Sequence, residues 1–139
     1  MCSSDLGDRD RHVLIIHIRL TDVHVQRVPV GGVVRSVERV GSSYFYPDHP
    51  GHFGNVRVVT TLDTPVGACV VEQIATLTTR RIRNALKPGE RVETGQRMGS
   101  ILLGSTAVLR VPRAEVRLEP SPGRRVYAGE TILARFSPP

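Results

Sequence analysis

The Gly104-Ser105 pair has the residue types that a chain needs to cut its own backbone. A serine hydroxyl can attack the carbonyl of the preceding residue when a base accepts its proton. Gly104 leaves that carbonyl unhindered and gives the backbone access to unusual φ and ψ angles. Alone, the pair is more typical of a β-turn or bulge. It gains weight because 35 residues follow Gly104, enough for strands that stay docked after a cut.

His24 could accept the serine proton, and Asp22 could orient it. In Asp22-Val23-His24-Val25-Gln26 polar and apolar residues alternate, and residues two apart on a strand point to the same side. An aspartate beside a histidine holds the imidazole in one tautomer. From the pattern alone, the polar face of a surface strand is the simpler interpretation.

A mainly β fold must position these residues. The chain has 139 residues, the size of one domain. Its 13 Gly and 10 Pro, with 4% aromatic residues, suit short strands joined by tight turns and exclude collagen and coiled coils. We expect residues 1–11 to be a disordered or non-native leader and residues 12–139 to be one domain. The patterns predict strands at His12–Leu20, Val23–Val28, Val33–Val40, Val56–Leu62, Ala68–Leu77, Met98–Leu103, Thr106–Val111, Glu115–Leu118 and Thr131–Phe136.

Two further segments bear on the fold. Gly41–Asn55, rich in Gly, Pro and aromatic residues, is predicted to be a long loop, and loops of this length are often functional. Pro88–Gly95 and Pro122–Gly129 match at an offset of 34 and predict a repeated Pro-Gly turn, short strand and Gly turn. This repeat is similar to the hammerhead turns of biotinyl and lipoyl domains. It predicts a barrel-sandwich-like β fold, but Lys87 precedes the turn, which disfavours a carrier function.

The charge and the cysteines exclude several classes. Basic residues outnumber acidic ones by 19 to 13, which favours anionic partners. The densest run, Arg80-Arg81-Ile82-Arg83, has no aromatic residue to stack on bases, so nucleic-acid binding is not indicated. Cys2 and Cys69 have no metal-ligand spacing, and we expect no metal site. Apolar runs such as Val13–Ile16 reach only four residues, so no membrane span is predicted.

The chain resembles the phosphatidylserine decarboxylase family, in particular its short form, over about Ile15 to Phe136. Each matching block is weak alone, but their order is specific. The last block, Leu-Gly-Ser-Thr, looks like the family's self-processing motif. The matching blocks are Leu20–Gly32, Val71–Ile82, Gly89–Gly99 and Leu103–Thr106.

The resemblance implies an enzyme that cuts itself into residues 1–104 and 105–139 and turns Ser105 into a covalent pyruvoyl cofactor. The implied reaction converts phosphatidylserine, or a related serine phospholipid, to phosphatidylethanolamine with release of carbon dioxide. With the resemblance, Asp22 and His24 become the preferred orienter and base. The two fragments are expected to form a heterodimer, with a higher oligomer open, at the cytoplasmic face of the cell membrane.

The resemblance also touches other residues. Arg27, Arg80 and Arg81 lie in matching blocks and could meet a phosphate or carboxylate, although solvated surface Arg is as good an interpretation. In the long form a histidine precedes an Asn-Glu-Arg-like element. Here His49 and His52 precede Asn55-Val56-Arg57, but the loop is shorter, so we rank both below His24. His12 and His17 are expected to be edge or partly buried residues of the first strand, and Cys69 a packed small side chain.

Two alternatives stay open: a non-catalytic barrel-sandwich binding module, and a pyruvoyl decarboxylase of a soluble amino acid. The chain departs from the family because a polar leader stands where an apolar, membrane-associating region is usual. We therefore expect an N-terminally truncated form that meets its lipid through a peripheral, Arg-rich surface. The lipid backbone, glycerol ester or archaeal ether, is left open.

Overall fold

Strands dominate the computed structural model, which describes residues 2–3, 11–19, 25–46, 48–76, 81–101, 105–112, 116–119, 123–127 and 131–136. The only helix in these ranges is a short 3-10 helix, η1 (His52–Gly54). The mainly β prediction is confirmed. The strands are β1 (Cys2–Ser3), β2 (Arg11–Ile18), β3 (Val25–Arg27), β4 (Gly32–Val40), β5 (Arg57–Thr64), β6 (Gly67–Ile74), β7 (Ile82–Asn84), β8 (Arg91–Val92), β9 (Arg97–Ile101), β10 (Ser105–Pro112), β11 (Val116–Leu118) and β12 (Ala134–Phe136).

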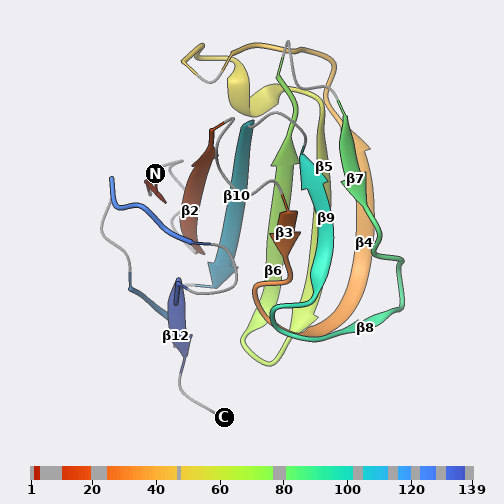
Figure 1. Cartoon of the computed structure of the whole chain (residues 1–139). Helices are drawn as coiled ribbons and strands as arrows, with labels where there is room; N and C mark the ends of the chain where they lie inside the picture. Colours follow the sequence, from red (N-terminus) through yellow and green to blue (C-terminus); the bar gives the residue numbers. More distant parts are fainter. Residues whose placement is uncertain are drawn as a thin grey trace.

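These strands form three antiparallel sheets. The large sheet has the order β1-β2-β10-β6-β5-β4-β8, and the smaller sheets are β3-β9-β7 and β11-β12. Figure 1 shows β3, β9 and β7 as a layer against the large sheet. β10 comes late in the chain but lies between β2 and β6, bonded along both edges. The segment after the predicted cut is therefore held in the middle of the large sheet.

Apolar side chains cover both faces of the large sheet near β2 and β10. Leu14 and Leu109 face the β3-β9-β7 sheet and share a core cluster with Met98 of β9. Their neighbours Val13 and Val108 belong to a second cluster on the opposite face, together with Ile15, Ile74 and Phe53 of η1. A strand buried on both faces needs apolar residues without alternation, which accounts for the run in β2.

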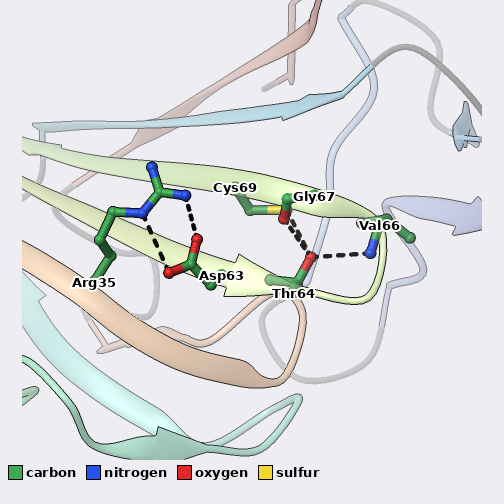
Figure 2. Close-up of polar contacts among 6 residues, drawn as sticks. All are labelled: Arg35, Asp63, Thr64, Val66, Gly67 and Cys69. Carbon is green, nitrogen blue, oxygen red and sulfur yellow. Dashed lines mark hydrogen bonds and ion pairs between the residues drawn. The ribbon is translucent and has the colours of Figure 1, made fainter.

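The β5–β6 hairpin shows how the turn residues fix the register of the sheet (Figure 2). Gly67 has a φ of +108°, a conformation that suits glycine. The Thr64 hydroxyl donates to the Gly67 carbonyl at 2.7 Å and accepts from the Val66 N–H at 3.3 Å. Next to the turn, Asp63 pairs with Arg35 of β4. Cys69 is fully buried beside Thr64, as expected of a packed small side chain.

The predicted strands match the observed ones within a few residues, and two observed strands, β1 and β7, were not predicted. β7 lies between the predicted strands Ala68–Leu77 and Met98–Leu103, and β8 lies within the first Pro-Gly repeat, where the repeat predicts a short strand. β1 lies within the expected leader and pairs with β2, while residues 4–10 lie outside the described residues. In the second repeat copy, residues 123–127 are not a strand, so the repeat stays a prediction.

Candidate active site

Ser105 is the first residue of β10, with its backbone opposite Ile18, the last residue of β2. The predicted cut therefore falls just outside a strand that is paired on both edges. Gly104, Asp22 and His24 lie outside the described residues, and only the backbone of Ser105 is described. The structure does describe Ile18, Val25 and Ile101, which lie close to them in the sequence.

The strand register brings these flanking residues together. At one end Ile18 faces Ser105, and at the other Val25, which follows His24, faces Ser100 of β9. The β2–β3 connection leads from Ile18 to Val25, and the β9–β10 connection leads from the strand that pairs with Val25 to the strand that pairs with Ile18. The two connections therefore link the same pair of sheets at neighbouring points. The predicted base lies on one of these connections and the scissile peptide on the other.

Polar side chains buried between the two layers hold β3 at this position. The Gln73 side chain of β6 donates to Gln26 of β3 at 2.9 Å. Asn84 of β7 donates to Gln73 at 3.0 Å and to Thr60 of β5 at 2.9 Å. Because buried amides are costly without partners, this network fixes how the sheets stack. It anchors the chain two residues after His24.

Thr106, the residue after the predicted nucleophile, lies at a buried junction of two histidines. Its Oγ1 is 2.9 Å from Nε2 of His52 and 3.2 Å from Nδ1 of His17. His17 faces Thr106 across the β2–β10 ladder, whereas His52 comes from η1. Thr106 and His52 are fully buried. Burial lowers the pKa of both His52 and His17, which favours the neutral imidazoles.

Asn55 fixes the loop that brings His52 to this place. Its side-chain NH₂ donates to the carbonyls of Phe45 at 2.8 Å and Ala75 at 2.7 Å. Its Oδ1 accepts from the Phe45 N–H at 2.8 Å and from the Ser43 hydroxyl at 3.1 Å. Asn55 is fully buried and joins both arms of the connection between β4 and β5, here called the 41–56 loop, to the end of β6. η1 is thereby held against the start of β10.

We expect Asn55→Ala to reduce the free energy of unfolding by about 2 to 4 kcal/mol, because it leaves buried groups such as the Ala75 carbonyl without their partner. Urea unfolding, in a Ser105→Ala background that stays uncut, measures this loss. Ser43→Ala is the matched control, since it removes only one of these bonds and should cost about 1 kcal/mol or less. An Asn55→Ala loss no larger than that of the control would contradict this role.

A second polar contact ties β10 to its neighbours on the same sheet. Glu72 of β6 accepts from Nε of Arg57 at 3.0 Å and from Nε of Arg110 at 3.1 Å, so it bridges β5 and β10. Arg57 also donates to the Asn55 carbonyl at 3.1 Å. These mostly buried charges link the ladder of β10 to the 41–56 loop.

The remaining predicted residues lie elsewhere. Arg27 is exposed and donates to the Gly95 carbonyl, at the end of β3 away from Ser100. Arg81 is exposed, and Arg80 lies outside the described residues. His49 is exposed and stacks on Phe45 at 3.9 Å between ring centroids, so only His52 of the loop pair reaches β10. Within the described ranges, no group of three or more His, Cys, Asp or Glu could hold a metal ion.

Other structural features add no chemistry. A shallow depression of about 490 Å³, lined by Gly32, Asp63 and Arg91 among others, lies at the ends of β4 and β5 remote from Ser105. None of the helical structure in the described ranges has the length and apolarity to cross a membrane. Among the polar clusters described above, the one formed by Thr106, His52 and His17 is the one next to Ser105.

Comparison with known proteins gives the class. The family profile described as phosphatidylserine decarboxylase matches residues 4–134. The chain belongs to this family. No solved structure gives a significant match.

Among the relatives are proteins named phosphatidylserine decarboxylase proenzyme. The Salinibacter ruber protein is 39% identical over 120 residues, which is 85% of this chain and 52% of the relative. The Nocardia farcinica protein is 37% identical over 134 residues, 95% of this chain and 56% of the relative. The Chlorobaculum tepidum protein is 36% identical over 115 residues, 82% of this chain and 53% of the relative. The chain thus spans little more than half the length of these relatives.

Proposed function

We propose that this chain is the self-processing, pyruvoyl-forming part of a decarboxylase that converts phosphatidylserine, or a related serine phospholipid, to phosphatidylethanolamine. The observation that carries the proposal is the double register, in which Ile18 faces Ser105 and Val25 faces Ser100. It supports a meeting of the base and the scissile peptide on neighbouring connections. The proenzyme names of the relatives support the same chemistry.

In the proposed self-processing step, Oγ of Ser105 attacks the carbonyl carbon of Gly104 and its proton passes to His24. The peptide C–N bond breaks, the nitrogen of residue 105 takes up a proton, and an ester forms. Loss of the α-proton of residue 105 then breaks its Cβ–O bond, which leaves a carboxylate on Gly104 and a dehydroalanine at residue 105. Water replaces its nitrogen, which leaves as ammonia, and a pyruvoyl group ends the new chain.

The start of β10 suits such a group. A cut before residue 105 breaks no ladder, because the pairs with β2 begin at Ser105 and those with β6 begin at Thr106. Fragments 1–104 and 105–139 would therefore stay together as a heterodimer. When present, the pyruvoyl group supplies a ketone for the substrate amine and accepts the electron pair released with carbon dioxide.

We further propose that the enzyme meets its lipid peripherally, at the cytoplasmic face of the membrane. Phe45 and Tyr46 are 39% and 48% exposed, on the loop that also carries His52. Aromatic side chains suit the boundary between water and lipid. The net charge of +6 favours anionic headgroups. The exposed aromatic side chains and the positive charge together support a membrane-docking surface next to the start of β10.

Labelled carbon dioxide released from the serine carboxyl group tests the function. We expect the wild-type chain to release it from a short-chain, soluble phosphatidylserine at salt concentrations that abolish turnover on anionic vesicles. The reason is that salt screens exposed charges beyond about 8 Å at physiological ionic strength, whereas the soluble lipid needs no surface attraction. Ser105→Ala should release none from either lipid. If the wild-type chain is cut but releases no labelled carbon dioxide, the proposed substrate is wrong. In that case, lipid binding that is unchanged in Ser105→Ala would favour a non-catalytic binding module.

A further inference from the structure

Counting the available N–H and O–H groups shows which atom donates and which accepts in each hydrogen bond around Thr106. The two N–H groups of the Asn55 side chain are taken by the carbonyls of Phe45 and Ala75, at 2.8 and 2.7 Å. They therefore offer no proton to Nδ1 of His52, which lies 3.3 Å from the Asn55 nitrogen. Nδ1 of His52 is 3.2 Å from the Phe45 carbonyl, which can only accept. Nδ1 of His52 accordingly carries the proton.

The other nitrogen of His52 then acts as an acceptor. In a neutral imidazole only one nitrogen bears hydrogen, so Nε2 offers its lone pair to the Thr106 hydroxyl at 2.9 Å. Because that hydroxyl has a single proton, its oxygen accepts from Nδ1–H of His17 at 3.2 Å. The chain of donors runs from His17 through Thr106 and His52 to the Phe45 carbonyl. A protonated His52 would reverse the middle bond, and its burial opposes that charge.

This chain fixes the residue next to the predicted cut. Thr106 is bound to Ser105 through one peptide, and its side chain is held from β2 on one side and from η1 on the other. We propose that His52 is a positioning residue for self-processing, which acts through the Thr106 hydroxyl to hold the start of β10 in register with the base. The inference rests on the proposed function, in that it requires a cut before Ser105. After the cut the same bonds hold the new chain end in place.

The test is the rate of self-cleavage of folded, freshly purified chain, followed by denaturing mass spectrometry. We expect His52→Ala and the near-isosteric Thr106→Val each to slow cleavage by about tenfold or more. His52→Gln, whose amide oxygen can accept the hydroxyl proton, and Thr106→Ser, which keeps the hydroxyl, should stay within about threefold of wild type. The double variant His52→Ala/Thr106→Val should be no slower than the slower single variant, because His52 acts through Thr106.

His49→Ala is the matched control, since His49 lies on the same loop but is exposed, and its cleavage rate should equal that of wild type. Cleavage of His52→Ala at the wild-type rate would overturn the inference, as would additive losses in the double variant. If His52→Ala does not fold, Thr106→Val against Thr106→Ser decides alone. A wild-type chain that stays whole would overturn the proposed function and this inference with it. A cut wild-type chain with unaffected variants would overturn the inference alone.

Discussion

Ser105→Ala should remain a single species of 15.3 kDa under conditions in which the wild-type chain is converted completely into two fragments. Scaling the mass by residue number gives fragments of roughly 11.4 and 3.9 kDa, the smaller about 17 Da below its hydrolysis mass because a pyruvoyl group replaces the serine end. The variant removes the attacking oxygen and nothing else, so the expected effect is all or none. Denaturing mass spectrometry over time measures it.

Ser100→Ala is the matched control for this variant. Ser100 belongs to β9, on the strand just before the scissile peptide, and faces Val25 and Arg83 across the smaller sheet. Cleavage of this control should be unaffected. A wild-type chain that stays at 15.3 kDa after prolonged incubation would contradict self-processing, and cleavage of Ser105→Ala at the same bond would contradict the nucleophile.

His24→Ala should slow self-cleavage by about a hundredfold or more, the usual effect of losing a general base. Asp22→Asn should slow it less, because the imidazole keeps its place but loses the partner that sets its tautomer. The expectation depends on the register at Val25, the residue after His24, which faces Ser100 of β9, the strand that precedes the scissile peptide in the sequence. The rates are measured as for Ser105→Ala.

His12→Gln serves as the control for these variants. His12 bonds the Val116 carbonyl at 3.0 Å, at the end of β2 away from Ser105, and its loss should leave the cleavage rate unchanged. Neither His24→Ala nor Asp22→Asn should unfold the chain, because β3 begins after both residues and is held through Gln26. Full cleavage in both variants would remove the pair from the mechanism.

The fold was largely predictable because its strands carry local signals. Turn residues such as Pro65 and Gly67 separate apolar runs, and the observed strands begin and end close to such residues. β1 and β7 were not predicted, since two or three residues give no period, and their pairing comes from neighbours far away in sequence. The order of the sheet, with β10 between β2 and β6, carries no local signal at all.

The site was predictable only as far as its motif. Ser105 stands out because glycine and serine adjoin between apolar runs, whereas His17 sits among apolar residues of the first strand and is expected to be an ordinary strand histidine. Its meeting with Thr106 depends on a ladder between residues 89 positions apart. The sequence ranks His52 below His24 because the loop is shorter than in the long form, and nothing in the sequence shows that this loop folds back onto β10. Asn55, which orders that loop, looks in the sequence like any other loop asparagine, and only the structure shows that it is buried.

The central position of β10 in the large sheet also determines the order in which the chain can fold. During synthesis β2, β5 and β6 leave the ribosome first, but β2 and β6 have no ladder between them until β10 arrives to pair with both. Contacts between segments so far apart form late in folding. The junction at Thr106 exists only after that insertion, so a nascent chain that lacks β10 has nothing to cut. If the proposed cut before Ser105 is made, the 105–139 fragment should exchange for a free copy only when the sheet around β10 unfolds.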